Sequence, residues 1–275
     1  MSGFYKNISG MIRPTTKDEL KREIRIRLDR GQYNLNDIDT SKITDMSNLF
    51  YEFDYINKID ISLWDVHNVR NMSFMFYACQ SFNCDLSGWD VSNVERMDYM
   101  FRNCKKFNSD LSKWDVSNVV DMRNMFCNCP SFNSDISNWD VSNVRDMNCM
   151  FFSCADFNSD ISKWDVGNVQ NMRTMFFQCT RFNSDLSNWN VSNVKNMNSM
   201  FSHCYSFNSD LSRWDVHKVE DMEYMFYRCL KFNSDLSKWD VSNVWNMNNM
   251  LVRNTNLKVY PEWYLQKQSV ISIEQ

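Results

Sequence analysis

Aspartate side chains recur at two fixed positions along this chain and are its clearest candidates for chemistry. A first column comprises Asp60, Asp85, Asp110, Asp135, Asp160, Asp185, Asp210 and Asp235. A second comprises Asp65, Asp90, Asp115, Asp140, Asp165, Asp215 and Asp240, with Asn190 interrupting it. Because hard cations prefer clustered carboxylates, one hypothesis is a calcium ladder. We favour the alternative, in which the first column accepts hydrogen bonds from turn amides and Lys113, Lys163, Arg213 and Lys238 offset the charge of the second.

The other reactive side chains do not form a recognisable catalytic set. His67 and His217 share one register six repeats apart and His203 lies elsewhere, which predicts neither a triad nor a zinc site. Seven of the ten cysteines share an apolar register, from Cys79 to Cys229, and this favours buried thiols in a reducing compartment. The five scattered glycines argue against a phosphate-binding loop. We therefore predict no enzyme activity, no metal and no cofactor.

These columns arise because the sequence repeats itself every 25 residues. The period is marked by Trp64, Trp89, Trp114, Trp139, Trp164, Trp189, Trp214 and Trp239. Self-similarity at a fixed period of this length is typical of solenoids, in which each unit buries its apolar face against its neighbours. We expect the tryptophans to lie above one another inside one continuous stack.

Within one coil the spacing of apolar residues changes along the chain. Trp114 and Val116 alternate with polar residues, which predicts a short strand over 113–117 with Lys113 and Asp115 facing outward. From Val119 the spacing becomes i, i+3, i+6, i+7, i+10, which predicts helix or 3-10 turns over 119–129. A further expectation concerns two asparagine columns, at positions 83–233 and 93–243, which we expect to hydrogen-bond the main chain between coils.

The two ends depart from the repeat. We expect 1–13 to be loose, and a helix over 17–30, with Thr16 and Glu19 as a capping box and Gly31 as its stop, to cover the first coil. We assign an extra residue to the turn 51–58. At the other end a short helix starting at Pro261 is expected to cover the last coil with Trp263, Tyr264 and Leu265. The predicted parts are 1–33 as tail and capping helix, 34–250 as about nine coils, and 251–275 as a degenerate cap and tail.

Composition restricts the class of partner. The net charge is -4, with 30 basic and 34 acidic residues interspersed, which gives no reason to expect nucleic acid. No apolar run is long enough to cross a membrane, and the first residues lack the apolar core of a secretory signal. We therefore expect no membrane insertion, an unknown protein partner and an intracellular location.

Two surfaces are candidates for partner contact. One is the predicted strand face, represented by Lys113, Asp115, Lys163, Asp165, Arg213 and Asp215. The other is the edge at which residues vary between coils, where Phe152 and Phe177 lie in adjacent coils. If these rings are exposed, they form an apolar patch that indicates a partner. If the helical edge covers them, they belong to the rim of the core.

The motif M-x-x-M-F-x-x-C-x-x-F-N-x-D-L-S-x-W-D-V-S-N-V resembles the BspA-like repeats of mycoplasma surface proteins, other bacteria and giant DNA viruses, over about residues 15–260. The resemblance implies an α/β fold: a right-handed leucine-rich-repeat-like solenoid with short parallel strands on one side and short helical or 3-10 turns on the other. It implies adhesion or partner binding and no catalytic residue. Our prediction is a non-enzymatic protein-protein interaction scaffold. The alternative is a structural or surface component of a giant-virus particle, or an adhesin-like protein.

Overall fold

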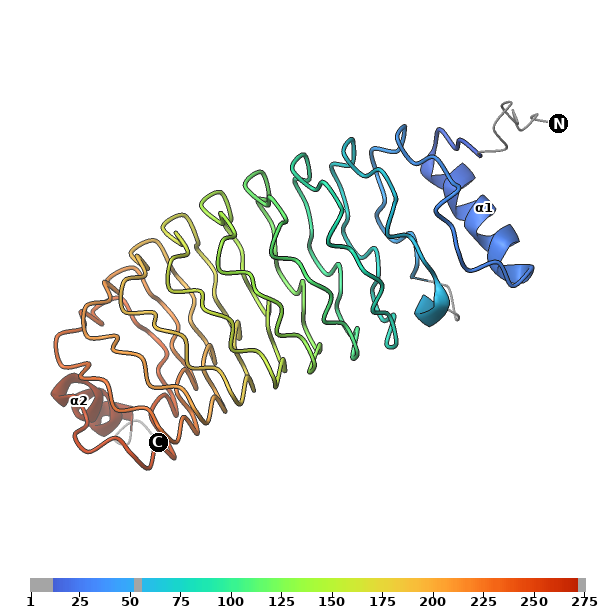
Figure 1. Cartoon of the computed structure of the whole chain (residues 1–275). Helices are drawn as coiled ribbons and strands as arrows, with labels where there is room; N and C mark the ends of the chain where they lie inside the picture. The colour runs from blue at the N-terminus through green and yellow to red at the C-terminus, as the bar shows by residue number, and fades with distance from the viewer. Residues whose placement is uncertain (1–11, 52–55, 272–275) are drawn as a thin grey trace.

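The chain forms a stack of 25-residue coils with a helix at each end, as the computed structural model in Figure 1 shows. The structure describes residues 12–51 and 56–271. Helix α1 spans Lys17–Asp29, the 3-10 helix η1 spans Ile56–Lys58, and helix α2 spans Glu262–Ile271. All three lie outside the regular coils that begin at Trp64, so the repeat itself is built from other local structure.

Each coil bends at tight corners closed by hydrogen bonds between core residues three positions apart. The N–H of Trp114 donates to the carbonyl of Leu111 at 3.1 Å, and that of Val119 donates to Val116 at 2.9 Å. The N–H of Cys129 likewise donates to Phe126. A hydrogen bond of this span closes a β-turn, so the apolar residues of the repeat mark its corners.

Adjacent coils are joined by a main-chain ladder whose four donors lie in one coil and whose four acceptors lie in the next coil along the chain. The donors in one coil are the N–H groups of Met97, Tyr99, Phe101 and Asn103, and the acceptors in the next are the carbonyls of Asp121, Arg123, Met125 and Cys127. Each regular coil also forms one isolated parallel bridge to the next, such as Arg96 to Asp121.

The predicted α/β fold class is wrong. The described residues contain isolated bridges but no β-strand, and their only helices lie outside the regular coils. Lys113 and Ser117, predicted to end a strand, both lie in turns, and 119–129 is a succession of turns rather than a helix. The predicted leucine-rich-repeat solenoid of strands and helical turns is therefore withdrawn. The physical reason is that an i, i+3 apolar spacing fits consecutive β-turns as well as it fits a helix.

Like residues lie above one another through the core. The rings of Trp139 and Trp164 are 6.4 Å apart and nearly parallel, and those of Phe126 and Phe151 are 5.7 Å apart. The eight tryptophans of the period are each 3–4% exposed, which confirms that they are buried. The core is thus continuous from coil to coil.

Buried polar atoms find their partners in the neighbouring coil. Trp139 donates from Nε1 to the carbonyl of Leu111 at 3.1 Å, and the Cys129 thiol donates to the carbonyl of Phe101 at 2.9 Å. Both asparagine columns bond main chain between coils, as predicted. In the first, Asn108 Oδ1 accepts from the N–H of Asn133; in the second, an amide Nδ2 donates to a carbonyl of the preceding coil.

Helix α1 confirms the predicted N-terminal helix. Thr16 Oγ1 accepts the N–H of Glu19, and the Glu19 carboxylate accepts the N–H of Thr15. Gly31 has a φ of +70°, the left-handed conformation that favours glycine after a helix. Leu20 and Ile24 of α1 are fully buried.

Helix α2 begins directly after Pro261, and its contacts continue those of the coils. Trp263 donates from Nε1 to the carbonyl of Leu236, as the tryptophan of a further coil would. Tyr264 is buried, whereas Leu265 is 55% exposed, so the predicted covering role of Leu265 is wrong. The predicted loose segment 1–13 and the inserted turn 51–58 fall largely outside the described residues.

Replacing a central tryptophan tests the stacked core. We expect Trp139→Ala to lower the free energy of unfolding by about 3–5 kcal/mol, because it removes a buried indole and its hydrogen bond. Leu63→Ala, at a side chain that is 77% exposed, is the control and should cost less than about 0.5 kcal/mol. Chemical denaturation measures both; a loss below about 1 kcal/mol for Trp139→Ala would contradict a buried column.

The left-handed positions of the coils give a second test. Ala78 has a φ of +62°, whereas Ala155, the only other alanine, is not among the residues with positive φ. Ala78→Gly removes a Cβ conflict and should raise the free energy of unfolding by roughly 0.5–1 kcal/mol. Ala155→Gly only loosens the unfolded chain and should lower it by about 0.4–1 kcal/mol. Equal effects of the same sign would count against this backbone geometry.

Candidate functional site

The aspartates of the first column accept hydrogen bonds that stabilise turns of the main chain. Asp110 Oδ1 accepts the N–H of Ser112 at 2.9 Å, and the equivalent bond recurs from Asp60 to Asp235. Hydrogen bonds from the Ser112 main chain and hydroxyl are the main cause that keeps the pKa of Asp110 below its ordinary value. The interpretation of this column as acceptors for turn amides is therefore confirmed.

The aspartates of the second column also accept hydrogen bonds that stabilise turns, and the neighbouring bases act on the first column. Asp115 Oδ1 accepts the N–H of Ser117 at 3.0 Å. The charge of Lys113 instead lowers the pKa of Asp110, and Lys163, Arg213 and Lys238 act in the same way on Asp160, Asp210 and Asp235. The same bases therefore act on the first column, and their effect on the second column stays a prediction.

The six residues predicted as contacts on the former strand face are all exposed: Lys113, Asp115, Lys163, Asp165, Arg213 and Asp215. They lie on a surface that repeats from coil to coil. Asp165 accepts the N–H of Gly167, and Asp215 pairs with His217 at 2.7 Å. A groove of about 730 Å³ passes Asp210, Arg213 and Lys238 on this surface. Contact with a partner here stays a prediction.

The structure reveals a third column of Asp and Asn side chains that accept turn hydrogen bonds, which was not predicted from the sequence. Asp121 Oδ1 accepts the N–H of Arg123, Asp146 Oδ1 accepts that of Asn148, and the asparagines at this register do the same. The available signal was an Asp or Asn placed one residue before the first methionine of every coil except the one with Arg96. It was obscured because Asp and Asn share this position and Arg96 interrupts them.

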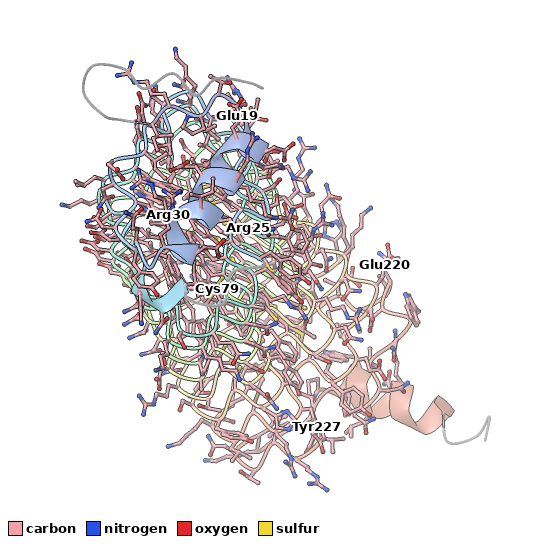
Figure 2. The ribbon with its side chains drawn as sticks, turned by 90° about the vertical axis from the view of Figure 1, so that its right-hand side faces the viewer. Glu19, Arg25, Arg30, Cys79, Glu220 and Tyr227 are labelled. Carbon is pink, nitrogen blue, oxygen red and sulfur yellow. The ribbon has the colours of Figure 1, made fainter. Side chains whose placement is uncertain are left out.

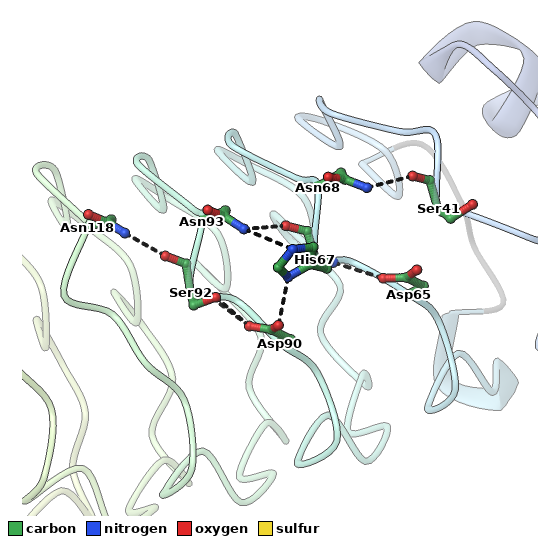
Figure 3. Close-up of polar contacts among 8 residues, drawn as sticks. All are labelled: Ser41, Asp65, His67, Asn68, Asp90, Ser92, Asn93 and Asn118. Carbon is green, nitrogen blue, oxygen red and sulfur yellow. Dashed lines mark hydrogen bonds and ion pairs between the residues drawn. The ribbon is translucent and has the colours of Figure 1, made fainter.

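His67 and His217 lie two residues after aspartates of the second column, and each donates its main-chain N–H to that aspartate. His67 Nδ1 lies 2.8 Å from Asp90 Oδ2 of the next coil, and Asn93 donates to the main-chain carbonyl of His67 (Figure 3). The same drawing shows Asn118 repeating this bond to Ser92. His217 instead pairs within its own coil.

Variable side chains lie along what we call the ladder face. It comprises residues 73–81, 98–106, 123–131, 148–156, 173–181, 198–206, 223–231 and 248–256, which include the ladder donors after the first methionine of each coil and the turn that follows them. Phe152 and Phe177 are half-buried here, with stacked rings 4.7 Å apart. The two rings are therefore neither a fully exposed apolar patch nor a fully covered part of the core.

Further aromatic residues extend the ladder face in both directions. The Phe177 ring lies 5.5 Å from that of His203, which lies 5.4 Å from that of Tyr227. Toward the N-terminus, Phe74 and Tyr99 stack at 4.4 Å. Tyr227 projects from a different side of the stack than Glu220 does (Figure 2). A discontinuous line of rings therefore follows the long axis of the molecule.

Chemically reactive groups are mostly withdrawn from solvent. Burial raises the pKa of Cys79 to about 12, and all ten cysteines are unpaired thiols. Among residues 12–51 and 56–271, no three His, Cys, Asp or Glu side chains converge as a metal site would require. In the same part of the chain, neither helix combines the length and apolar character needed to cross a bilayer.

His203 gives the ladder face a pH-dependent element. Burial, with the nearby charge of Arg228, lowers the pKa of His203 below its ordinary value. The unfolded chain therefore takes up this proton at a higher pH than the folded chain does. The stability contributed by neutral His203 is complete above pH 6.5 and is lost as the pH falls from there through the lowered pKa.

Replacing His203 should reduce this loss. We expect the melting temperature of His203→Gln to fall less than that of the wild type when the pH is lowered from about 7.5 to about 5. Differential scanning calorimetry measures the two profiles, and their offset above pH 7 supplies the baseline. Parallel profiles throughout this range would show that His203 is not protected from protonation.

Comparison with known proteins places this repeat in a family. The family model described as "Mycoplasma protein of unknown function, DUF285" matches residues 26–122, 108–194 and 163–263, which together span most of the chain. No curated protein matches the sequence. The three overlapping matches agree with the run of stacked coils. The chain belongs to this family of repeat proteins of unknown function.

Proposed function

We propose that this protein is a non-enzymatic scaffold that binds a partner protein through its ladder face. The observation that carries the proposal is the half-buried stack of Phe152 and Phe177, continued by His203 and Tyr227. Aromatic rings held in a rigid array supply contact area at low cost in conformational entropy. The neighbouring ladder bonds hold the backbone beneath them.

Backbone strain supports the same surface. Phe74, Tyr99, Thr174 and Tyr224 have φ values of 52–59°, where large or β-branched residues are disfavoured by about 1–2 kcal/mol each. Asn124 and Asn249 occupy the same register in other coils, and asparagine adopts this conformation more readily. Bulky residues at strained positions on a surface favour a role for these side chains outside folding.

The alternative role is that of a structural or surface component of a virus particle, or of an adhesin. Such a role needs a surface on which the same contacts repeat regularly. The repeating face of Lys113, Asp115 and their equivalents suits it better than the ladder face does. We favour the scaffold because the side chains that differ between coils gather on the ladder face. We also propose kinship with the BspA-like repeats, and a reducing setting such as the host cytoplasm, in which the buried thiols stay unpaired.

Affinity capture from host-cell lysate tests the scaffold. We expect Phe152→Ala/Phe177→Ala to reduce capture of the partner by at least about tenfold, because truncating aromatic anchors removes much of the binding energy. Leu63→Ala/Val259→Ala is the matched control, since it removes two exposed apolar side chains away from the ladder face. Quantitative mass spectrometry compares the captured proteins, and circular dichroism confirms that each variant is folded. Equal capture by both double variants would remove the ladder face from consideration.

A further inference from the structure

Charge is divided unevenly between the ladder face and the rest of the molecule. The ladder face contains nine Lys and Arg residues and three Asp and Glu residues, a formal charge of +6. The whole chain carries -4, so the remainder carries -10. The even mixture of charges along the sequence therefore conceals a basic face on an acidic body. Only the coil geometry, which brings every 25th residue together, makes this visible.

Each of the three acidic residues of the ladder face interacts with another side chain. Asp98 is 1% exposed and accepts a hydrogen bond from Ser73, and Asp156 pairs with Arg181 at 3.0 Å. Glu223 accepts a hydrogen bond from Asn198 of the preceding coil. Because Asp98 is buried and Asp156 is paired with a base of the same face, the excess of basic groups remains on the solvent side.

Several bases of the face are exposed without a partner of opposite charge. Lys105, Lys106, Arg173, Lys231 and Arg253 are exposed, and no ion pair joins them to an acid within the described residues. They occupy coils on both sides of the Phe152–Phe177 stack. Basic groups and half-buried rings therefore share one surface along the stack.

We propose that the ladder face binds an acidic polypeptide segment of the partner protein, an inference that rests on the proposed scaffold function. Its carboxylates meet the exposed lysines and arginines, and its apolar side chains lie against the rings of Phe152, Phe177 and Tyr227. Charge complementarity of this kind raises association rates and selects the partner. The acidic remainder of the molecule repels the same segment and so confines it to this face.

The ring geometry favours polypeptide over single-stranded nucleic acid. Nucleic-acid bases stack on free aromatic faces. Here Phe152 and Phe177 each cover one face of the other at 4.7 Å, and Phe74 and Tyr99 do so at 4.4 Å, so these faces are closed to a base. The bases are also spaced irregularly from coil to coil, whereas the aspartate columns of a second copy would present charges at a constant spacing. A different protein with a matching sequence fits this pattern better than self-association does.

A random peptide library displayed on phage tests the chemistry of the partner. We expect peptides selected on the full-length protein to be enriched in Asp and Glu interleaved with apolar residues, and to bind less tightly at higher salt. Arg173→Glu/Lys231→Glu should weaken these peptides by about tenfold. Lys113→Glu/Lys163→Glu, an identical change of net charge on the repeating face, is the matched control and should leave the affinity within about twofold.

Four results would overturn the inference. They are selected peptides without acidic enrichment, equal weakening by the two charge-reversal variants, tighter binding of an oligothymidylate than of the peptides, and self-association that Arg173→Glu/Lys231→Glu abolishes. The scaffold proposal fails separately. If Phe152→Ala/Phe177→Ala abolishes partner capture while the selected peptides lack acidic residues, the ladder face binds a partner but not an acidic one.

Discussion

The whole structure depends on hydrogen bonds that a coil can complete only with its neighbour. The Trp139 indole, the Cys129 thiol and the four ladder N–H groups of a coil all bond to carbonyls of an adjacent coil. Buried polar groups without partners are costly, so a single coil would leave several such groups unsatisfied. Stability therefore arises between coils, and the two end helices matter because they stand where a further coil is missing. Trp263 shows this directly by repeating the bond of the column tryptophans.

The same constraint explains which parts of the fold could be predicted. A constant period forces like residues above one another, so the buried tryptophans, the asparagine ladders and the capping helix α1 followed from the sequence alone. The path of the chain within a coil did not follow. The apolar spacing after Val119 is common to a helix and to consecutive β-turns, and only the backbone hydrogen bonds distinguish them. The polar residues were the better guide: Asp121 and Asn124 suit an Asx turn and a left-handed position, which a helix interior disfavours.

The candidate site residues also fall into two groups, the regular columns and the irregular positions of the ladder face. The regular columns looked most like chemistry because repetition is conspicuous, yet the carboxylates of Asp110 and Asp115 bond the turns of their own coil. The irregular positions carried little signal individually. Phe152 and Phe177 could be paired from their spacing, whereas the contact of His203 with Phe177 and Tyr227 crosses two different registers and needed coordinates. The basic character of the ladder face was hidden for a related reason, since net charge along a sequence averages over faces that the fold separates.

The residues with positive φ connect the coil geometry to the proposed binding surface. The coil geometry imposes a positive φ twice per coil on the ladder face, at residues such as Asn124 and Asn128, whatever side chains occupy these positions. Asparagine or glycine would relieve the strain, and the chain has only five glycines. Tyr99 and Tyr224 are therefore kept at a cost in stability that the stacked core must offset. Because the core is almost identical from coil to coil, it tolerates such strain in several coils at once. The uniformity of the interior is thus what allows the ladder face to vary.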